Sequence, residues 1–480
     1  MKRHLQALCL GLLALLLACG VSVAKPVKIH GFVTAFNSPT SFDIEDYKIT
    51  RDSTLVMEIE KEDDGGALAT FKPEDIRVGT ELEIKGNYDE STSELKASSI
   101  KVFLDDTRTI KRVALIEKVP TLQRSNAGWI GTVAADGQKV SIAETTVVSF
   151  RLNKSERKQV NKGAEETSPL LSTDQLTLNT FIHYEGVRQS DGSILAKKVE
   201  FQHAELADGE AKMWRELTPK IKATDFSNSK PGELRVEKTK YKLVPSKEAQ
   251  DYITTLGESI VPTRQRDLPL DSNLRIPFRF FLVEDKSFNA SCYPNGVVIV
   301  HSGIFDVAEN EAQLAFVLSH EITHAIEKHV WREHEYHKNA LMALRIGGAV
   351  GAAFGGQGIS NMTTLIEAGV RNGYARSLEN QADRVGLEWM LASGYDVREA
   401  PETWKAVAKK YGDHRTNFFW DNHDNNTMRR SYLMSEIRNN YADVDFSSLR
   451  KDTEEFHKVA GVVHDTTARK KKIKLKTAKQ

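Results

Sequence analysis

The most informative stretch of this chain is His320-Glu321-Ile322-Thr323-His324. No proline or glycine occurs from residue 309 to residue 330, and apolar residues recur there at helical intervals, which predicts an amphipathic helix. Residues four apart lie on one helix face, so His320 and His324 can turn ring nitrogens toward one metal ion. Glu321 lies about 100° further round the helix and can hold a water on that metal as general base. The pattern is typical of a zinc site.

A solvated helix face that carries this pattern by chance is the alternative. Apolar Leu318 and Ile322 argue against it, because they predict that the histidine face is at least half buried. Buried histidines need polar partners, and a metal ion supplies one.

A zinc site of this kind needs a third protein ligand. The longer metzincin pattern would place glycine and histidine where the chain has Glu327 and Val330, so that arrangement is excluded. Three further histidines follow the motif: His329, His334 and His337. The first of them lies half a turn away from His320 on a continuous helix, so we expect these histidines to support the ligands or to lie on the surface.

The remaining candidate is a carboxylate on a second predicted helix that ends at Ser393-Gly394. Glu379 and Asp383 lie one turn apart on this helix. Glu379 can therefore bind the metal, while Asp383 can accept the outer N–H of a ligand histidine and fix its tautomer. An exposed acidic face paired with neighbouring arginines is the alternative.

In this order, the motifs resemble the gluzincin metallopeptidases that include HtpX, the CAAX prenyl proteases and their soluble periplasmic relatives. The resemblance covers residues 243–437. It rests on three groups of residues: Asn289-Ala290 with Pro294-Asn295-Gly296, Glu311 to Leu318 before the zinc motif, and Tyr374-Ala375-Arg376 before Glu379. It implies one zinc ion per chain, bound by three ligands: His320, His324 and Glu379. It also implies that Glu321 is the catalytic acid/base and that Asp383 orients a ligand.

The resemblance further implies an oxyanion site near residues 420–429. In the family, a histidine followed six residues later by an arginine lies over the cleft and stabilises the oxyanion of the tetrahedral intermediate. His423 and Arg429 match that spacing, but Asp424 stands where the family usually has proline. A surface turn in this asparagine-rich loop is the alternative.

An edge hairpin is predicted before the active helix. Asn295-Gly296 is a tight-turn signal, and the run from Val297 to Val300 is β-branched throughout. One edge of the hairpin can accept an extended peptide as an added strand, with Asn289 and Ala290 as substrate-binding residues beside the zinc. A hairpin with a purely structural role is the alternative.

Residues 1–24 have the composition of a secretory signal, with a basic start and an apolar core too short to span a membrane. Two processing routes stay open. Cleavage after Ser22-Val23-Ala24 would free a soluble protein, whereas the lipoprotein-like box that ends at Cys19 would leave a lipid anchor on that cysteine. Either route predicts an exported protein, periplasmic or secreted in the first case and membrane-tethered in the second, without a transmembrane span.

The residues before the peptidase region contain an internal repeat. Gly31-Phe32-Val33-Thr34-Ala35 recurs 100 residues later as Gly131-Thr132-Val133-Ala134-Ala135, and Ile84-Lys85-Gly86 as Tyr184-Glu185-Gly186. Each copy alternates short β-branched runs with polar turns, which predicts a small antiparallel barrel of OB-like type. Such a module can dock a protein or cell-envelope partner, or it can be a spacer or a cover for the peptidase.

We therefore expect a multidomain α+β protein in which two β-barrel modules precede a mainly helical zincin domain with a small edge sheet. The predicted segments are a signal peptide at 1–24, barrel modules at 26–104 and 125–204, a linker at 205–242, a peptidase domain at 243–450 and a tail at 451–480 that is basic and disordered at its end, from Arg469 to Lys479.

Two functions from different classes fit this plan. The first is a zinc endopeptidase that cuts exported or cell-envelope proteins or peptides, in quality control or processing. The second is a latent peptidase that acts as a chaperone-like or envelope-binding scaffold through its β modules. The complete ligand and base set favours the enzyme. Nucleic acid is not expected as a partner, because the 66 basic and 66 acidic residues balance and the chain carries an export signal.

Overall fold

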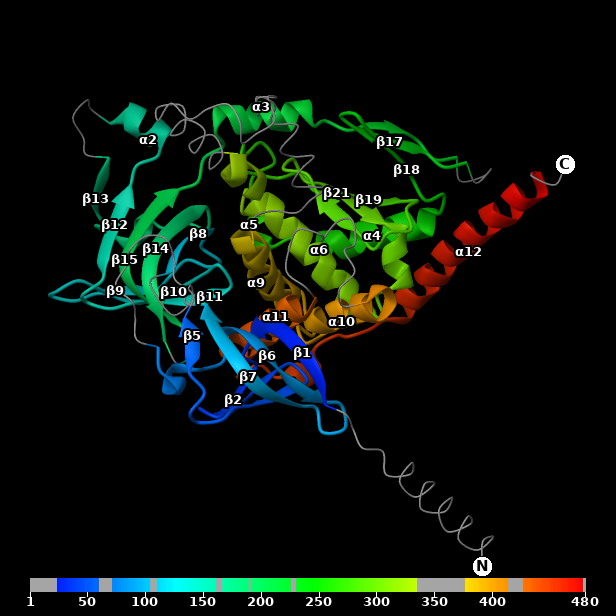
Figure 1. The fold of residues 1–480 in the computed structure, drawn as a ribbon. Helices are drawn as coiled ribbons and strands as arrows, with labels where there is room; N and C mark the ends of the chain where they lie inside the picture. Colours follow the sequence, from blue (N-terminus) through cyan, green and yellow to red (C-terminus); the bar gives the residue numbers. More distant parts are fainter. Residues whose placement is uncertain are drawn as a thin grey trace, which may run out of the picture. The chain divides into compact units, whose positions relative to one another are not determined.

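The protein forms two compact units, residues 1–104 and residues 105–480. A computed structural model describes residues 24–59, 71–103, 110–160, 166–189, 191–225, 230–334, 376–412 and 426–477. The first unit contains one β module. The second contains a second β module and a mainly helical region with small sheets of its own (Figure 1).

The first β module is a mixed sheet with the strand order β1-β6-β7-β4-β3-β2, and β5 also pairs with β7. Its strands are β1 Lys25–Phe32, β2 Ala35–Ser38, β3 Ser41–Ile44, β4 Tyr47–Thr50, β5 Met57–Ile59, β6 Glu81–Asp89 and β7 Glu94–Phe103. β6 lies antiparallel between β1 and β7, while β4 and β5 run parallel to β7. Alternate residues such as Phe42, Ile84 and Leu95 point inward and form the core.

The second β module repeats this pattern of pairing. Its elements are β8 Ile110–Leu115, β9 Leu122–Arg124, β10 Trp129–Ala135, β11 Gln138–Ile142, β12 Val147–Arg151, α2 Lys154–Gln159, β13 Thr167–Pro169, η2 Thr173–Gln175, β14 Thr180–Arg188 and β15 Ile194–His203. β14 lies antiparallel between β8 and β15, and β11 and β12 run parallel to β15. The module begins at β8, before the predicted residue 125, because β8 pairs with β14.

Only part of the sequence repeat corresponds to equivalent positions in the two sheets. Gly86 and Gly186 both lie where the long hairpin shifts its register. Gly31 lies on β1, however, whereas Gly131 lies on β10, whose counterpart in the first module is β3. The modules therefore differ in length before their hairpins, and a constant offset aligns only their second halves.

The prediction of closed antiparallel barrels is not confirmed. Among the named strands of the described residues, no pairing closes either sheet, although an isolated bridge joins Ile116 to Ala135 in the second module. Each sheet also contains parallel pairs. Alternating hydrophobicity predicts where strands occur, but it does not specify which strands pair over long distances.

The helical region follows. Its elements are α3 Asp208–Glu216, β16 Lys220–Lys222, β17 Glu233–Val236, β18 Thr239–Lys242, α4 Lys247–Ile260, α5 Thr263–Arg266, β19 Arg279–Val283, β20 Ala290–Cys292, β21 Val297–His301, η3 Ser302–Asp306, α6 Glu311–Ile326, α9 Arg376–Ala392, α10 Glu399–Tyr411, α11 Asn426–Asn440, η4 Phe446–Ser448 and α12 Glu454–Thr477. α6 packs against α9, α4 and α10. Every residue of α6 is buried, so this helix is the centre of the region.

The predicted hairpin before α6 is present. β20 and β21 pair antiparallel, and Gly296 occupies the turn with φ of 80°. β19 joins β21 on its other side in parallel orientation, which gives the order β19-β21-β20. β20 is therefore an edge strand and lies against α6.

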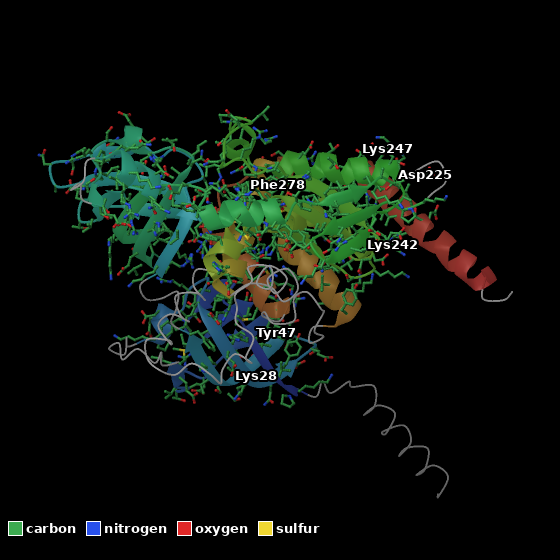
Figure 2. All side chains as sticks on the ribbon, turned by 90° about the horizontal axis from the view of Figure 1, so that it is seen from above. Lys28, Tyr47, Asp225, Lys242, Lys247 and Phe278 are labelled. Atoms are coloured by element: carbon green, nitrogen blue, oxygen red, sulfur yellow. The ribbon has the colours of Figure 1, made fainter. Side chains whose placement is uncertain are left out.

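Residues 205–242, predicted as a linker, form α3 and the sheet β16-β17-β18. Met213, Leu217 and Leu234 share a hydrophobic core with residues of β21. The segment is folded because it buries these apolar side chains, while lysines such as Lys242 remain exposed (Figure 2).

The predicted disordered tail also differs from the structure. α12 runs to Thr477, and its first half is anchored through buried Phe456 and Val459. Lysine and arginine have high helix propensity, so the basic residues can continue the helix. The signal peptide, Cys19 and the apolar segment 341–354 lie outside the described residues. Among the residues described, no helix combines the length and apolar composition that a membrane crossing requires.

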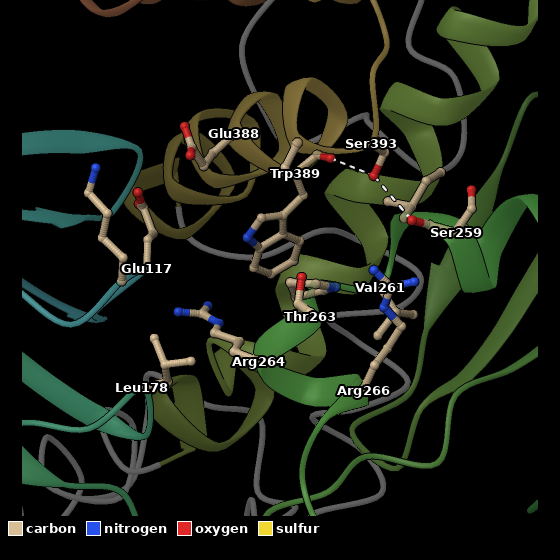
Figure 3. Close-up of a pocket in the computed structure, with 14 residues that line it drawn as sticks. Glu117, Leu178, Ser259, Val261, Thr263, Arg264, Arg266, Glu388, Trp389 and Ser393 are labelled. Carbon is tan, nitrogen blue, oxygen red and sulfur yellow. Dashed lines mark hydrogen bonds between the residues drawn. The ribbon is translucent and has the colours of Figure 1, made fainter.

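The second β module and the helical region enclose a cavity of about 280 Å³ (Figure 3). Charged side chains from both parts line it: Glu117 and Lys118 after β8, Arg264 and Arg266 on α5, and Glu388 on α9. The residues of the predicted zinc site are not among those that line it.

We expect Gly186→Ala to destabilise the second unit. A β-carbon at Gly186 would lie 2.5 Å from the carbonyl oxygen of Leu195, so the hairpin would have to shift. The expected loss is about 1–3 kcal/mol in the free energy of unfolding. Urea unfolding followed by tryptophan fluorescence measures it, because all six tryptophans lie after residue 104.

Gly461→Ala is the matched control. No atom lies within 4 Å of a β-carbon placed at Gly461, which is in a helix interior, so this change should be neutral or stabilise by up to about 1 kcal/mol. Equal midpoints for Gly186→Ala and the wild type would contradict the proposed strain.

Candidate metal centre

α6 presents two histidines on one face. The side chain of Asn310 caps the helix by accepting a hydrogen bond from the N–H of Gln313 at 3.0 Å. About three to four turns further along the helix, the Nε2 atoms of His320 and His324 lie 3.0 Å apart. Both side chains are almost completely buried.

α9 brings a carboxylate to the same point. One oxygen of Glu379 lies 3.3 Å from Nε2 of His320, and the other lies 3.9 Å from Nε2 of His324. The candidate ligand atoms of these three residues all lie within 4.8 Å of one another. The cluster that was predicted from the sequence is thus assembled by the fold.

The three side chains fit a zinc ion. Zinc takes imidazole nitrogen and carboxylate oxygen at about 2.0–2.2 Å, which places tetrahedral neighbours roughly 3.3 Å apart. The separations of 3.0 and 3.3 Å from the His320 nitrogen agree with that spacing. Two imidazoles and one carboxylate also form the donor set of known hydrolytic zinc sites.

Asp383 holds the first histidine in place. Its Oδ1 lies 2.9 Å from Nδ1 of His320, which leaves Nε2 directed toward the other candidate ligands. Arg429 on α11 donates from Nε to the second oxygen of Asp383 at 3.1 Å. Burial lowers the pKa of His320, but the hydrogen bonds to Asp383 and Glu379 outweigh burial and raise this pKa to about 9.

A second chain of hydrogen bonds holds His324. Its Nδ1 lies 2.8 Å from Nδ1 of His329, and Nε2 of His329 lies 3.1 Å from Oε1 of Gln381. The amide nitrogen of Gln381 donates to the carbonyl of Val113 at 3.2 Å, so the amide oxygen must face His329. Gln381 then accepts from His329, His329 accepts from His324, and Nε2 of His324 keeps its lone pair for a metal. Burial lowers the pKa of His324 to about 3, which keeps the ring neutral.

The support from His329 was not foreseen in this form. The sequence predicts an unbroken helix to residue 330, but α6 ends at Ile326 and Lys328 adopts φ of 57°. This left-handed residue turns the chain so that His329 faces back toward His324. Lysine is unusual in that conformation, so no local sequence signal marks the turn.

Glu321 lies beside the edge strand. The backbone N–H of Cys292 on β20 donates to its carboxylate. Its Oε1 is buried and has no hydrogen-bond partner among the described residues. Burial, with Glu379 nearby, raises the pKa of Glu321 to about 8.

The predicted substrate-binding residues lie at the start of the same strand. Asn289 accepts a hydrogen bond at its carbonyl from the N–H of His301, and Ala290 is the first residue of β20. The side-chain oxygen of Asn289 is buried without a hydrogen-bond partner in the described part of the chain. The outer edge of β20 pairs with no described strand.

Arg429 reaches the cluster, whereas His423 lies outside the described residues. The Arg429 guanidinium packs 4.1 Å above the Trp404 ring and is 5% exposed. Its Nη1 lies 3.8 Å from an oxygen of Glu379. Trp404 belongs to α10, and no sequence motif predicts its contact with Arg429.

The region that contains the cluster is similar to a known peptidase family and to several known proteins. Residues 248–443 match the family model described as peptidase family M48, and residues 30–101 match a domain of unknown function, DUF5666. The chain is 30% identical over 167 residues to the putative beta-barrel assembly-enhancing protease of Vibrio cholerae serotype O1, over 34% of this chain and 33% of the relative. It is 31% identical over 157 residues to the beta-barrel assembly-enhancing protease of Escherichia coli (strain K12), over 31% of each chain.

A mitochondrial relative is similar over the same region. The mitochondrial metalloendopeptidase OMA1 of Arabidopsis thaliana is 30% identical over 141 residues, which cover 29% of this chain and 27% of the relative. The chain thus spans about a third of the length of the curated relatives that it matches.

Residues 248–443 are thus similar to peptidase family M48 and to relatives that are named proteases or metalloendopeptidases. The comparisons do not test the narrower resemblance to HtpX and the CAAX prenyl proteases, which stays a prediction. The DUF5666 match ends at residue 101, although the second module repeats the strand pairing of the first.

We expect Asp383→Asn to weaken zinc binding by about 10–100-fold. The neutral amide is a poorer acceptor for the N–H of His320, and it leaves the charge of Arg429 without its carboxylate partner. Competition with a fluorescent zinc chelator measures the affinity. Asp445→Asn, at an exposed carboxylate that only caps η4, should keep wild-type affinity. Unchanged affinity in Asp383→Asn would remove Asp383 from the site.

Proposed function

We propose that the chain is a zinc-dependent endopeptidase that hydrolyses peptide bonds of exported or cell-envelope proteins, in quality control or processing. The observation that carries the proposal is the buried cluster of His320, His324 and Glu379 with the Glu321 carboxylate beside an unpaired strand edge. The M48 match and the names of the relatives support the class of reaction.

When bound, a zinc ion supplies Lewis-acid activation of the scissile carbonyl and of the attacking water. Glu321 takes the proton from that water and passes it to the leaving amine. A carboxylate positioned beside the reacting water is suited to carry the proton in both steps. Nε2 of His320 and of His324 would hold the metal, because Asp383 and His329 engage the opposite ring nitrogens.

Charge that develops on the carbonyl oxygen needs hydrogen-bond donors. We assign this role to His423 and Arg429, as the family spacing implies. Arg429 lies close enough to the Glu379 carboxylate to reach the reacting region. Its contacts with Asp383 and Trp404 also fix the guanidinium before substrate arrives.

The substrate would bind as an extended strand along β20. Main-chain hydrogen bonds at a sheet edge give affinity with little dependence on side chains. The buried, unpaired oxygen of Asn289 is suited to accept an N–H from such a peptide, next to Ala290. This mode of binding favours unfolded or misfolded chains over compact ones.

The cellular setting is part of the proposal. We propose that the signal-like residues 1–24 direct export of the enzyme to the periplasm or outside the cell, or to a membrane through a lipid at Cys19. We also propose that the first β module docks a protein or cell-envelope partner.

Glu321→Gln should lower kcat/KM for an unfolded protein substrate by at least about 100-fold, because it removes the general base. Zinc content should stay at one ion per chain, since Glu321 is not among the ligands. Removal of zinc by a chelator should abolish cleavage, and added zinc should restore it. Glu309→Gln, at an exposed glutamate before α6, is the control and should keep activity.

The latent scaffold makes the opposite prediction for the wild type. Bound zinc without cleavage of any unfolded protein would favour that alternative, and full activity in Glu321→Gln would exclude this residue as the base.

Substrate state gives an independent test of strand addition at β20. We expect one protein to be cleaved much faster when it is unfolded, for example after its disulfides are reduced and blocked, than when it is folded. Peptide products are quantified by mass spectrometry over time. Equal rates for the two states would contradict binding as an added strand.

A further inference from the structure

The second β module meets α9 at the residue that follows Asp383. The guanidinium of Arg384 is buried, and its Nη2 donates to both carboxylate oxygens of Asp136 at 2.8 and 2.7 Å. The Nε of Arg384 donates to the backbone carbonyl of Asp136 at 3.1 Å. Asp136 is 1% exposed and lies in the two-residue turn between β10 and β11. Neighbouring residues of α9 therefore point to different partners: Asp383 contacts His320, and Arg384 contacts the second β module.

Gly137, the second residue of this turn, allows the turn to lie close to the backbone of α9. Gly137 has φ of 62°, and a β-carbon on it would lie 2.6 Å from the carbonyl oxygen of Arg384. Only glycine lets the turn contact the backbone of α9 at this distance. The N–H of Gly137 donates to Glu117 at 2.7 Å, which holds the turn in place.

The first β module provides an internal comparison. Its equivalent turn, between β3 and β4, also has two residues and starts with a positive φ, 53° at Glu45 against 64° at Asp136. Its second residue is Asp46, however, and a side chain there would block the close approach that Gly137 permits. The Asp-Gly pair that permits these two contacts is thus present in the turn of the second module and absent from that of the first.

The same module also contacts the other elements of the metal centre. β8 holds the Gln381 amide through Val113, and the N–H of Leu115 donates to Glu327 just after α6 at 3.1 Å. Glu327 is fully buried and pairs with Arg264. On α11, Glu436 accepts from Gln138 of β11 at 2.6 Å.

We propose that the second β module is a positioning element of the metal centre rather than a docking domain. Asp136 and Gly137 set the position of α9, and Val113 sets the orientation of the Gln381 amide that acts through His329 on His324. The inference rests on the proposed zinc site and adds that zinc affinity depends on this module. Ligand geometry must be held within about 0.5 Å for full effect, so small displacements of α9 matter.

The test compares Asp136→Asn and Gly137→Ala with the wild-type full chain. Each variant should bind zinc about 10-fold more weakly in chelator competition while circular dichroism shows a folded protein. Asp174→Asn, at an exposed aspartate of the same module, should keep wild-type affinity. If Asp136→Asn fails to fold, Gly137→Ala still tests the proposal, because it keeps both charges of the buried pair.

A double-mutant cycle tests whether Asp136 affects zinc affinity through Arg384. If Asp136 acts through Arg384, Asp136→Asn should change zinc affinity much less in an Arg384→Gln background than in the wild type. A lower unfolding midpoint with unchanged zinc affinity in both Asp136→Asn and Gly137→Ala would overturn the proposal, since the module would then only stabilise the fold.

Because the test measures zinc affinity rather than cleavage, the failure of the positioning role can be distinguished from the failure of the proposed endopeptidase function. A wild-type protein that binds zinc but cleaves nothing would refute the endopeptidase, while a loss of zinc affinity in the variants would still support the positioning role.

Discussion

The burial of two imidazoles and a carboxylate between α6 and α9 is the constraint on which the rest of the second unit depends. His320, His324 and Glu379 are each only 2–3% exposed. A buried polar atom without a partner costs roughly 1–3 kcal/mol, so the outer ring nitrogens of the two histidines each require a hydrogen bond. Asp383 and His329 supply these bonds, and each is held in turn by a further residue. The cluster is stable only if this network is complete.

That requirement explains why a β module is fused so closely to a helical region. The network continues outward from α9 to the second module through Gln381 and Arg384. The buried pair of Arg384 and Asp136 would leave an uncompensated charge if the module moved away. Two modules with the same strand pairing thus have different relations to the rest of the chain: the first belongs to a compact unit of its own, and the second is part of the unit that holds the candidate centre.

Local patterns in the sequence were sufficient to predict most residues of the candidate site. The spacing of His320 and His324 on one helix, the carboxylates one turn apart on α9 and the Asn295-Gly296 turn each follow from short-range geometry. The support of His324 could not be predicted, because Lys328 turns the chain in a conformation that lysine rarely adopts. Contacts over long sequence distances were also missed: the parallel strand pairs, the folded segment 205–242, and the link between Asp136 and Arg384 across 248 positions. These depend on tertiary packing, which hydrophobic periodicity does not specify.

X-ray absorption at the zinc edge of the purified wild-type protein tests the central claim most directly. We predict one zinc ion per chain with nitrogen and oxygen neighbours at about 2.0–2.2 Å, including the scattering pattern of two imidazoles. Cys292, which is buried near Glu321, offers the sulfur that a different site would use. A zinc–sulfur distance near 2.3 Å, or no bound zinc in the folded protein, would contradict the assignment of His320, His324 and Glu379.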